Sequence, residues 1–351
     1  MARIRALEWS GVGRTAEIEP QWGRMRQQEG EAQARALTLN LICRAQDAAD
    51  AARVAEFLWE LGPRHPARVF VLAPGGAGGG VRVAAHAQGS ELVELAATPE
   101  RAASAVSLVA PLLISDLPVV LLWRGGDPHA NREFQEWAAM ADRVLVDAHR
   151  MRLPPAQLAA LAQELPARAS LCDLTWTRLT PWRQLLCQGL EAEREGSRRI
   201  RRVSLTAGHG RQPTASLAAT LFAGWLAHLL HWTPQERLGV DALRLRDAAG
   251  EEVTLRFQPC PSEERHGLLR RLVVEGEEGG MSVVVQHRGE RLSVNVRGGG
   301  RLLGEWAGPA TSPERSEAET LNEELSIHGR DLLYQPALEC GLALIARLEA
   351  A

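Results

Sequence analysis

The sequence contains no lysine, and all 40 basic residues among its 351 are arginine. A P-loop needs a lysine beside the nucleotide phosphates, and Schiff-base chemistry needs an amine that can lose its proton. Arginine cannot replace that amine, because its guanidinium stays protonated in proteins. The kinase mechanism, which uses a strand lysine, is excluded for the same reason. The absence of lysine therefore removes three common kinds of active site.

Cysteine pairs, long apolar runs and an excess of charge are also lacking. The five cysteines share no CxxC spacing, which argues against a disulfide framework or a zinc site. No apolar run approaches the roughly 18–20 residues that cross a membrane, and no signal-peptide h-region is present. The net charge of −3 argues against a dedicated nucleic-acid binder. We therefore expect a cytoplasmic protein without a bound metal, a membrane association or a nucleic-acid partner.

The first half of the chain alternates between strand-like and helix-like segments. Residues 1–35 are polar and irregular, which predicts an N-terminal arm. Short apolar runs rich in branched side chains then alternate with segments of helical periodicity, as in 36–45, 47–62 and 66–74. Such alternation is typical of a parallel sheet with right-handed crossovers. The sequence thus predicts an α/β domain with a mostly parallel sheet over residues 36–170.

After residue 170 the pattern changes. Helical segments come first, at 180–190 and 213–232, and several alternating strand-like segments follow, separated by glycine-rich and charged turns. Two further helical segments close the chain. This order predicts an α+β domain with antiparallel strands over residues 171–351.

Candidate small-molecule sites are few. The turn after the first strand reads CRAQDAAD and has no GxGxxG, which argues against a Rossmann cofactor site, and the glycine run at 75–80 is typical of a surface loop. His228 and His231 lie one helical turn apart without a third metal ligand. Asp147 follows a strand, at the end where open α/β sheets bind ligands, so it marks a possible ligand crevice. No catalytic constellation is recognisable.

The segment DLTWTRLTPWRQLL, which begins at Asp173, concentrates tryptophan and arginine in a chain with 5% aromatics. Trp182 is expected to pack inward on a helix, and Arg183 could hold Asp173 or a carboxylate of a partner protein. Trp176 and Arg178 precede that helix, where a guanidinium can stack on an indole. Two interpretations stay open: a latch between the domains, or a binding hot spot of the kind that tryptophan and arginine dominate.

Three other segments are distinctive: HPARVFVL (65–72), SDLPVVLLWRGG (115–126) and GRDLLYQPAL (329–338). Together with the tryptophan segment, they resemble the glucose-6-phosphate dehydrogenase assembly protein family, also called OpcA. The resemblance implies a non-catalytic protein that binds glucose-6-phosphate dehydrogenase, promotes its active oligomeric form and raises its activity in the oxidative pentose phosphate pathway. It also implies that NADP belongs to the partner, so no cofactor is expected here, and that the tryptophans and arginines of the segment shape the binding surface or hold the two halves together.

Two alternatives remain. The α/β half could be an enzyme or a sensor that binds a sugar phosphate or a nucleotide beside Asp147, because arginines hold phosphate well. The chain could also be a structural component of another complex. Redox control through Cys172 and Cys187, the cysteines that flank the tryptophan segment, is disfavoured, because their separation crosses a turn and a helix.

Overall fold

The computed structural model describes residues 18–20, 37–74, 80–85, 90–97, 105–192, 199–208, 215–260, 268–277, 280–288, 291–308, 316–327 and 329–350. Apart from residues 18–20, the expected N-terminal arm lies outside these ranges. The chain divides into two compact units. The first comprises Met1–Leu153, Ala160–Leu174 and Leu321–Arg330, and the second comprises Pro154–Ala159, Thr175–Thr320 and Asp331–Ala351. The expected boundary after residue 170 is close to the one at residue 174, but Leu321–Arg330 returns to the first unit. Within the described residues, no helix has both the length and the apolar character to cross a membrane.

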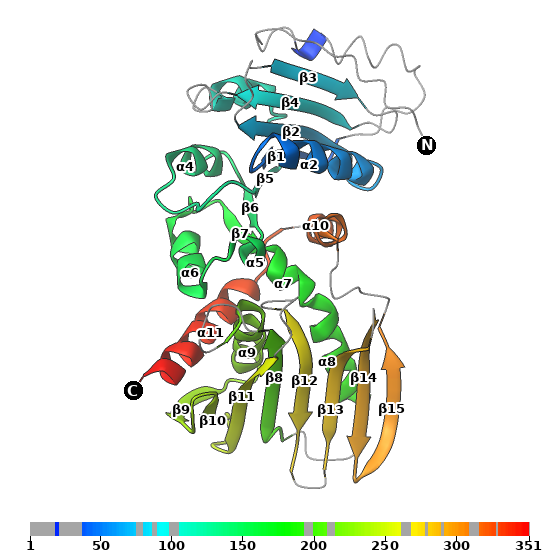
Figure 1. The fold of residues 1–351 in the computed structure, drawn as a ribbon, viewed down its shortest axis with the longest axis vertical. Helices are drawn as coiled ribbons and strands as arrows, with labels where there is room; N and C mark the ends of the chain where they lie inside the picture. The colour runs from blue at the N-terminus through cyan, green and yellow to red at the C-terminus, as the bar shows by residue number, and fades with distance from the viewer. Residues whose placement is uncertain are drawn as a thin grey trace. The chain divides into compact units, whose positions relative to one another are not determined.

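The first unit contains a seven-stranded sheet in the order β3-β4-β2-β1-β5-β6-β7 (Figure 1). All neighbours from β4 to β7 are parallel, and β3 is antiparallel to β4. The predicted mostly parallel α/β architecture is therefore confirmed. The strands are β1 (Leu39–Arg44), β2 (Ala67–Pro74), β3 (Gly80–Ala85), β4 (Glu91–Ala97), β5 (Val119–Trp123), β6 (Arg143–Val146) and β7 (Ser170–Asp173).

Apolar residues on the strands of this sheet pack against the surrounding helices. On β1, Leu41 belongs to a core cluster with Val54 of α2 and Leu321 of α10, which explains why the late segment joins the first unit. Strands of a parallel sheet are buried on both faces, and β1 and β5 accordingly show continuous burial. The remaining helical elements are α2 (Ala48–Leu61), η1 (Ala110–Leu112), α4 (Arg132–Ala138), α5 (Ala148–Met151), α6 (Pro155–Glu164) and α10 (Glu317–Ser326).

The second unit contains an eight-stranded sheet in the order β15-β14-β13-β12-β8-β11-β10-β9. Its neighbours are antiparallel, as the sequence predicts, except that β8 and β11 run parallel at the centre. The sequence predicted no strand between the helical segments at 180–190 and 213–232, where β8 lies. The strands are β8 (Arg202–Gly208), β9 (Thr233–Arg237), β10 (Ala242–Arg246), β11 (Glu252–Cys260), β12 (Leu269–Glu275), β13 (Ser282–Arg288), β14 (Arg291–Gly298) and β15 (Arg301–Ala307).

Helices of the second unit pack on one face of this sheet. The helices are α7 (Leu174–Arg178), α8 (Thr180–Ala192), α9 (Leu217–Leu229) and α11 (Tyr334–Glu349). Gly189 of α8 approaches Val283 and Val294 so closely that an added Cβ would lie 2.6 Å and 3.2 Å from their methyl groups. The helices α9 and α11 meet at Gly224, where a Cβ would lie 1.9 Å from the carbonyl oxygen of Ala337. Glycine is therefore required at this crossing.

Candidate functional site

The strand order of the first unit contains a topological switch point. From β1 the chain continues to β2 on one side, whereas β5, the other neighbour of β1, continues to β6 on the opposite side. Open α/β sheets bind ligands in the crevice outside the carboxyl ends of two such strands. Here those ends carry Arg44 and Arg124, the last residue of β1 and the first residue after β5. Both arginines bind carboxylates of this chain.

Arg124 forms a bidentate ion pair with Asp50 in the first turn of α2. Its Nε and Nη2 atoms donate to Oδ2 and Oδ1 of Asp50 over 2.8 Å and 2.6 Å. Asp50 is 2% exposed and also accepts a hydrogen bond from the backbone amide of Gln46. Burial opposes the ionisation of Asp50, but the hydrogen bonds from Arg124 and Gln46 outweigh it, so the pKa of Asp50 lies below its usual value. The carboxylate is thus held in its charged form.

Arg44 forms a second bidentate pair, with Glu133 of α4. The distances from Nε to Oε1 and from Nη2 to Oε2 are 2.8 Å and 2.7 Å. The guanidinium carbon lies 5.4 Å from the ring centroid of Trp123, within the range of a cation–π contact. Together the two pairs place four charged side chains at the switch point and satisfy them internally.

Asp147 and Asp173 converge on the start of α5. Asp147 directly follows β6, as the sequence predicts, and its Oδ1 caps the helix by accepting from the backbone amide of Arg150 at 3.2 Å. Asp173 ends β7, and its Oδ1 accepts from the amide of Ala148 at 3.0 Å. Both side chains are buried. Contact of Asp147 with a ligand stays a prediction, as does pairing of Asp173 with an arginine. Among the described residues, no group of three or more His, Cys, Asp or Glu could hold a metal.

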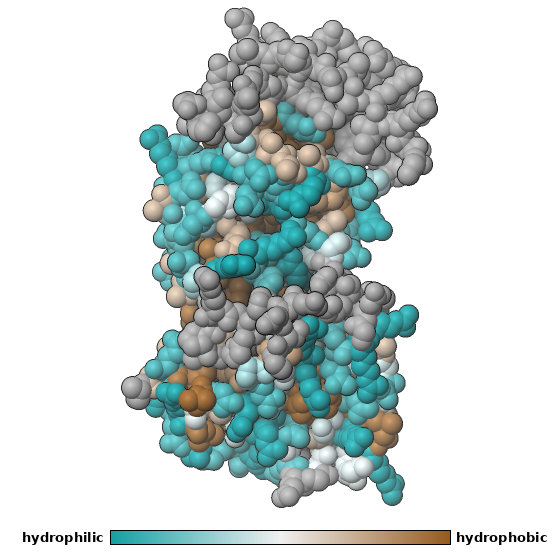
Figure 2. All heavy atoms as spheres, viewed as in Figure 1, coloured by the Kyte–Doolittle hydropathy of each residue, from teal (hydrophilic) through white to brown (hydrophobic). Residues whose placement is uncertain are grey.

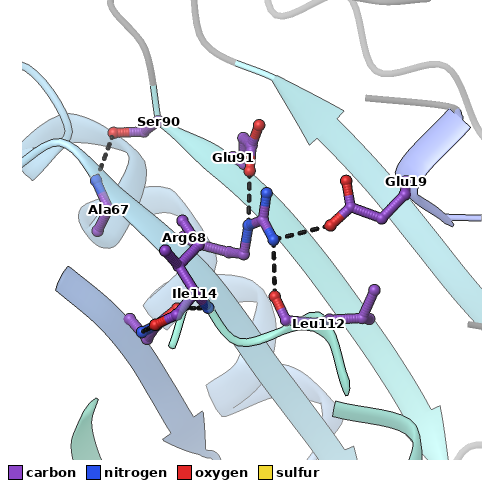
Figure 3. A network of polar contacts seen from close by, with 8 residues as sticks. Glu19, Ala67, Arg68, Ser90, Glu91, Leu112 and Ile114 are labelled. Carbon is purple, nitrogen blue, oxygen red and sulfur yellow. Dashed lines mark hydrogen bonds and ion pairs between the residues drawn. The ribbon is translucent and has the colours of Figure 1, made fainter. Parts of the chain in front are cut away.

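A third buried arginine, Arg68 of β2, organises the other end of the sheet (Figure 3). Its Nε donates to Glu91 of β4 at 2.7 Å, and its Nη1 donates to Glu19 at 2.8 Å and to the carbonyl of Leu112 at 2.7 Å. The side chains of Arg68 and Glu91 are 8% and 3% exposed. One guanidinium thus connects two strands, the helical turn at residues 18–20 and η1.

In the second unit, the tryptophan segment folds onto itself. The guanidinium carbon of Arg183 lies 3.7 Å from the ring centroid of Trp176. Arg183 also donates from Nη1 to the carbonyl of Trp176 and from Nη2 to the hydroxyl of Thr180, at 3.1 Å and 3.0 Å. The arginine that the structure shows stacked on Trp176 is Arg183, whereas the sequence suggested Arg178. The sequence placed Trp176 and Arg178 before the helix, whereas in the structure both lie in α7, a helical turn of its own.

The indole of Trp176 reaches a distant part of the chain. Its Nε1 donates to Oδ2 of Asp331 at 2.6 Å, and its ring lies 6.0 Å from that of Tyr334. The other carboxylate oxygen of Asp331 accepts from the amides of Leu333 and Tyr334 at 2.8 Å and 3.3 Å, at the start of α11. Sequence reasoning did not identify Asp331 as a partner. The available signal was that it lies in GRDLLYQPAL, one of the segments that resemble the same family.

Both tryptophans of the segment are internal. Trp176 and Trp182 are 3% and 5% exposed, and Trp182 packs edge-on against His287 of β13 with ring centroids 5.2 Å apart. Their burial favours a role in organising the second unit and leaves little indole surface for a partner. In contrast to these buried rings, Leu332, which follows Asp331, is 76% exposed. Figure 2 shows that brown, apolar patches on the visible surface of the described residues are small and separated by hydrophilic areas.

Comparison with solved structures shows the same fold. Biliverdin reductase from Synechocystis sp. PCC 6803, solved with biliverdin and NADP+, aligns at a TM-score of 0.50 and 12% identity, covering 88% of this chain and 98% of the other. An aldose–aldose oxidoreductase from Caulobacter crescentus, solved with glycerol, aligns at a TM-score of 0.50 and 14% identity, covering 89% and 96%. At these identities the likeness concerns the fold alone.

Comparison with known sequences shows the family. The putative OxPP cycle protein OpcA of Synechocystis sp. is 26% identical over 146 residues, which cover 41% of this chain and 30% of that protein. The matched region thus spans less than a third of the relative's length. Two family models match, both for domains of a glucose-6-phosphate dehydrogenase subunit: the N-terminal domain over residues 60–163 and the C-terminal domain over residues 169–338. Since these two matches together cover most of the sequence, the chain belongs to the OpcA family of glucose-6-phosphate dehydrogenase assembly proteins.

Proposed function

We propose that this protein binds glucose-6-phosphate dehydrogenase, promotes the active oligomeric form of that enzyme and raises its activity, without catalysing a reaction itself. The match of both family models, one for each half of the chain, carries the proposal. The switch point of the first unit supports the non-catalytic part. There the chain's own ion pairs, Arg44 with Glu133 and Arg124 with Asp50, occupy the place where such a sheet receives a ligand.

The mechanism is a shift of population in the partner. A binding protein raises the fraction of an active state only if it binds that state more tightly than the inactive one. A preference of about 1.4 kcal/mol changes the ratio of the two states tenfold. On this mechanism the sugar phosphate and NADP bind to the dehydrogenase, and the present chain needs no cofactor.

A titration of this chain into the purified dehydrogenase from the same organism tests the proposal. NADPH production and the mass of the complex are followed together, at dehydrogenase concentrations where both inactive and active oligomers are present. We expect a saturable rise in rate that parallels the appearance of a heavier complex. An unchanged rate with no complex would contradict both association and activation, and a complex without a change in rate would contradict activation alone.

The four charged side chains at the switch point also define a competing function, a sensor or enzyme that binds a sugar phosphate or nucleotide. To bind a phosphate there, Arg44 or Arg124 would have to exchange its carboxylate for the ligand. Tight binding raises the melting temperature of the free chain. We expect no rise with glucose 6-phosphate, 6-phosphogluconate, NADP or ATP. A saturable rise that is lost in Arg124→Gln would favour the competing function.

A further inference from the structure

The sheet of the second unit has one aliphatic face and one polar face. The aliphatic residues alternate along each strand and face the helices, as Val283 and Val294 do against Gly189 of α8. The residues between them point the other way, and we call their surface the open face. Strand register aligns them in rows across the sheet, one of which is Arg256, Ser204, Val273, Val284, Asn295 and Glu305.

The centre of the open face is apolar and its surroundings are polar. Val273 of β12 lies directly opposite Val284 of β13, and both side chains are half-buried. Ser204 and Asn295 flank this pair on the neighbouring strands. A small apolar centre within a polar, hydrogen-bonding surround is the composition of a non-obligate protein interface.

The open face carries more positive than negative charge. Its described glutamates are Glu236, Glu252, Glu275 and Glu305, and each pairs with an arginine of the same face, namely Arg202, Arg244 or Arg288. Further arginines remain without a carboxylate within 4.0 Å among the described residues: Arg246, Arg256, Arg271 and Arg297. The chain as a whole has a net charge of −3, so this positive excess is local to the face.

The dimensions of the open face match those of a protein interface. Eight strands spaced about 4.8 Å apart span roughly 34 Å, and strands of about seven residues rising about 3.3 Å each extend roughly 23 Å. The product is roughly 800 Å², close to the area that each partner contributes to an interface of standard size. The face is therefore large enough for stable docking without help from the rest of the chain.

We propose that the open face is the surface through which this protein docks onto an acidic surface of its partner dehydrogenase. The arginines that have no carboxylate partner among the described residues supply the attraction, since a planar guanidinium binds carboxylates bidentately. The valine pair supplies the apolar centre. This inference rests on the proposed function for the identity of the partner, and on the charge and shape of the face for its location.

The test compares four forms of the full chain in binding to the dehydrogenase by titration calorimetry or interferometry. The first is the wild type, the second carries Arg256→Glu, Arg271→Glu and Arg297→Glu, and the third carries the same charge change outside the face, at the exposed Arg64, Arg132 and Arg152. The fourth form, with glutamine at the three open-face positions, keeps the side chains polar and only neutralises them. Circular dichroism and thermal unfolding verify that each variant folds.

We expect the open-face reversal to raise Kd by about 100-fold, the glutamine variant to raise it by about tenfold, and the control reversal to leave it within about threefold. The affinity of the wild type should fall with added salt, and the glutamine variant should show a weaker salt dependence. Equal binding by all four forms would overturn the docking surface while leaving the proposed function intact.

A positively charged face could instead bind a nucleic acid, so binding to a DNA duplex is measured on the same four forms. Loss of duplex binding in the open-face reversal, with unchanged binding to the dehydrogenase, would also overturn the docking surface. Failure of the wild type itself to bind the dehydrogenase would instead contradict the proposed function.

Discussion

Several arginine side chains of the first unit turn inward, whereas several on the open face of the second unit turn to solvent. Arg44, Arg68 and Arg124 are largely buried, and each binds a carboxylate. Arg256 and Arg271 are exposed and have no carboxylate partner among the described residues. A chain without lysine thus uses one cationic side chain for two tasks. Removing one member of a buried pair is costly because its partner stays buried, whereas exposed cations remain available to a partner.

The largest expected effect is the loss of an inward arginine. Arg68→Met removes the charge that Glu91, itself 3% exposed, faces across the strands. Because a buried carboxylate then loses the cation that it binds, we expect the free energy of unfolding to fall by about 3–5 kcal/mol. Urea unfolding followed by circular dichroism measures this change. In the control Arg132→Met, the arginine is 91% exposed, and a change within about 0.5 kcal/mol is expected. Equal effects of the two substitutions would break the distinction between inward and outward arginines.

The next effect concerns the arginine that stacks within the second unit. Trp176→Phe keeps a ring beneath Arg183 but removes the Nε1 group that donates a hydrogen bond to Asp331. We expect a loss of about 1–3 kcal/mol, because a partly buried carboxylate loses a hydrogen bond. Trp306→Phe is the matched control, since its Nε1 bonds to Gln188 in an exposed position. Thermal unfolding of the two variants should differ clearly, and a larger loss in the control would contradict the role of Trp176.

The ion pair at the switch point should show a characteristic pH dependence. The pKa of Asp50 is lowered in the folded protein, so its contribution to stability is full above the ordinary aspartate value of about 3.9 and is lost as the pH falls through the folded value. We therefore expect the stability difference between the wild type and Asp50→Asn to be largest near pH 7 and to narrow as the pH approaches about 3. Urea unfolding at a series of pH values measures it. A difference independent of pH would show that the charge of Asp50 contributes nothing.

The smallest effect is expected on the open face. Arg256→Gln and Arg271→Gln remove exposed charges that have no carboxylate partner within the described part of the chain, so the free energy of unfolding should change by no more than about 0.5 kcal/mol. Thermal unfolding of the free chain is the measurement. A loss above about 1 kcal/mol from either substitution would place that arginine among the structural ones and remove it from the docking surface.

The sequence predicted the elements with strong local signals. The strand, helix and strand over 36–74 appear at the expected places because each carries its own periodicity and punctuation. The strands β7 and β9 have four and five residues, which are too few to show a period. The parallel pairing of β8 with β11 depends on long-range contacts, which no local sequence pattern encodes.

The candidate site was predictable only in part. Asp147 was placed correctly at the end of its strand, because that position follows from the element itself. The stack of Arg183 on Trp176 involves α7, a helical turn that the sequence did not predict. The bond from Trp176 to Asp331 joins residues 155 positions apart, a contact that depends on the folded unit. Local propensity carries no information about such a partner.

The late position of α10 and α11 in the sequence has a consequence for synthesis on the ribosome. Leu321 and Leu325 belong to the core of the first unit, and Gly224 of α9 receives the backbone of α11 at Ala337. A nascent chain that has reached residue 315 therefore holds the strands of both sheets while neither core is fully covered. Synthesis of α10 and α11 then covers both cores. Chaperones that recognise exposed apolar sheet surface would bind most strongly just before this moment.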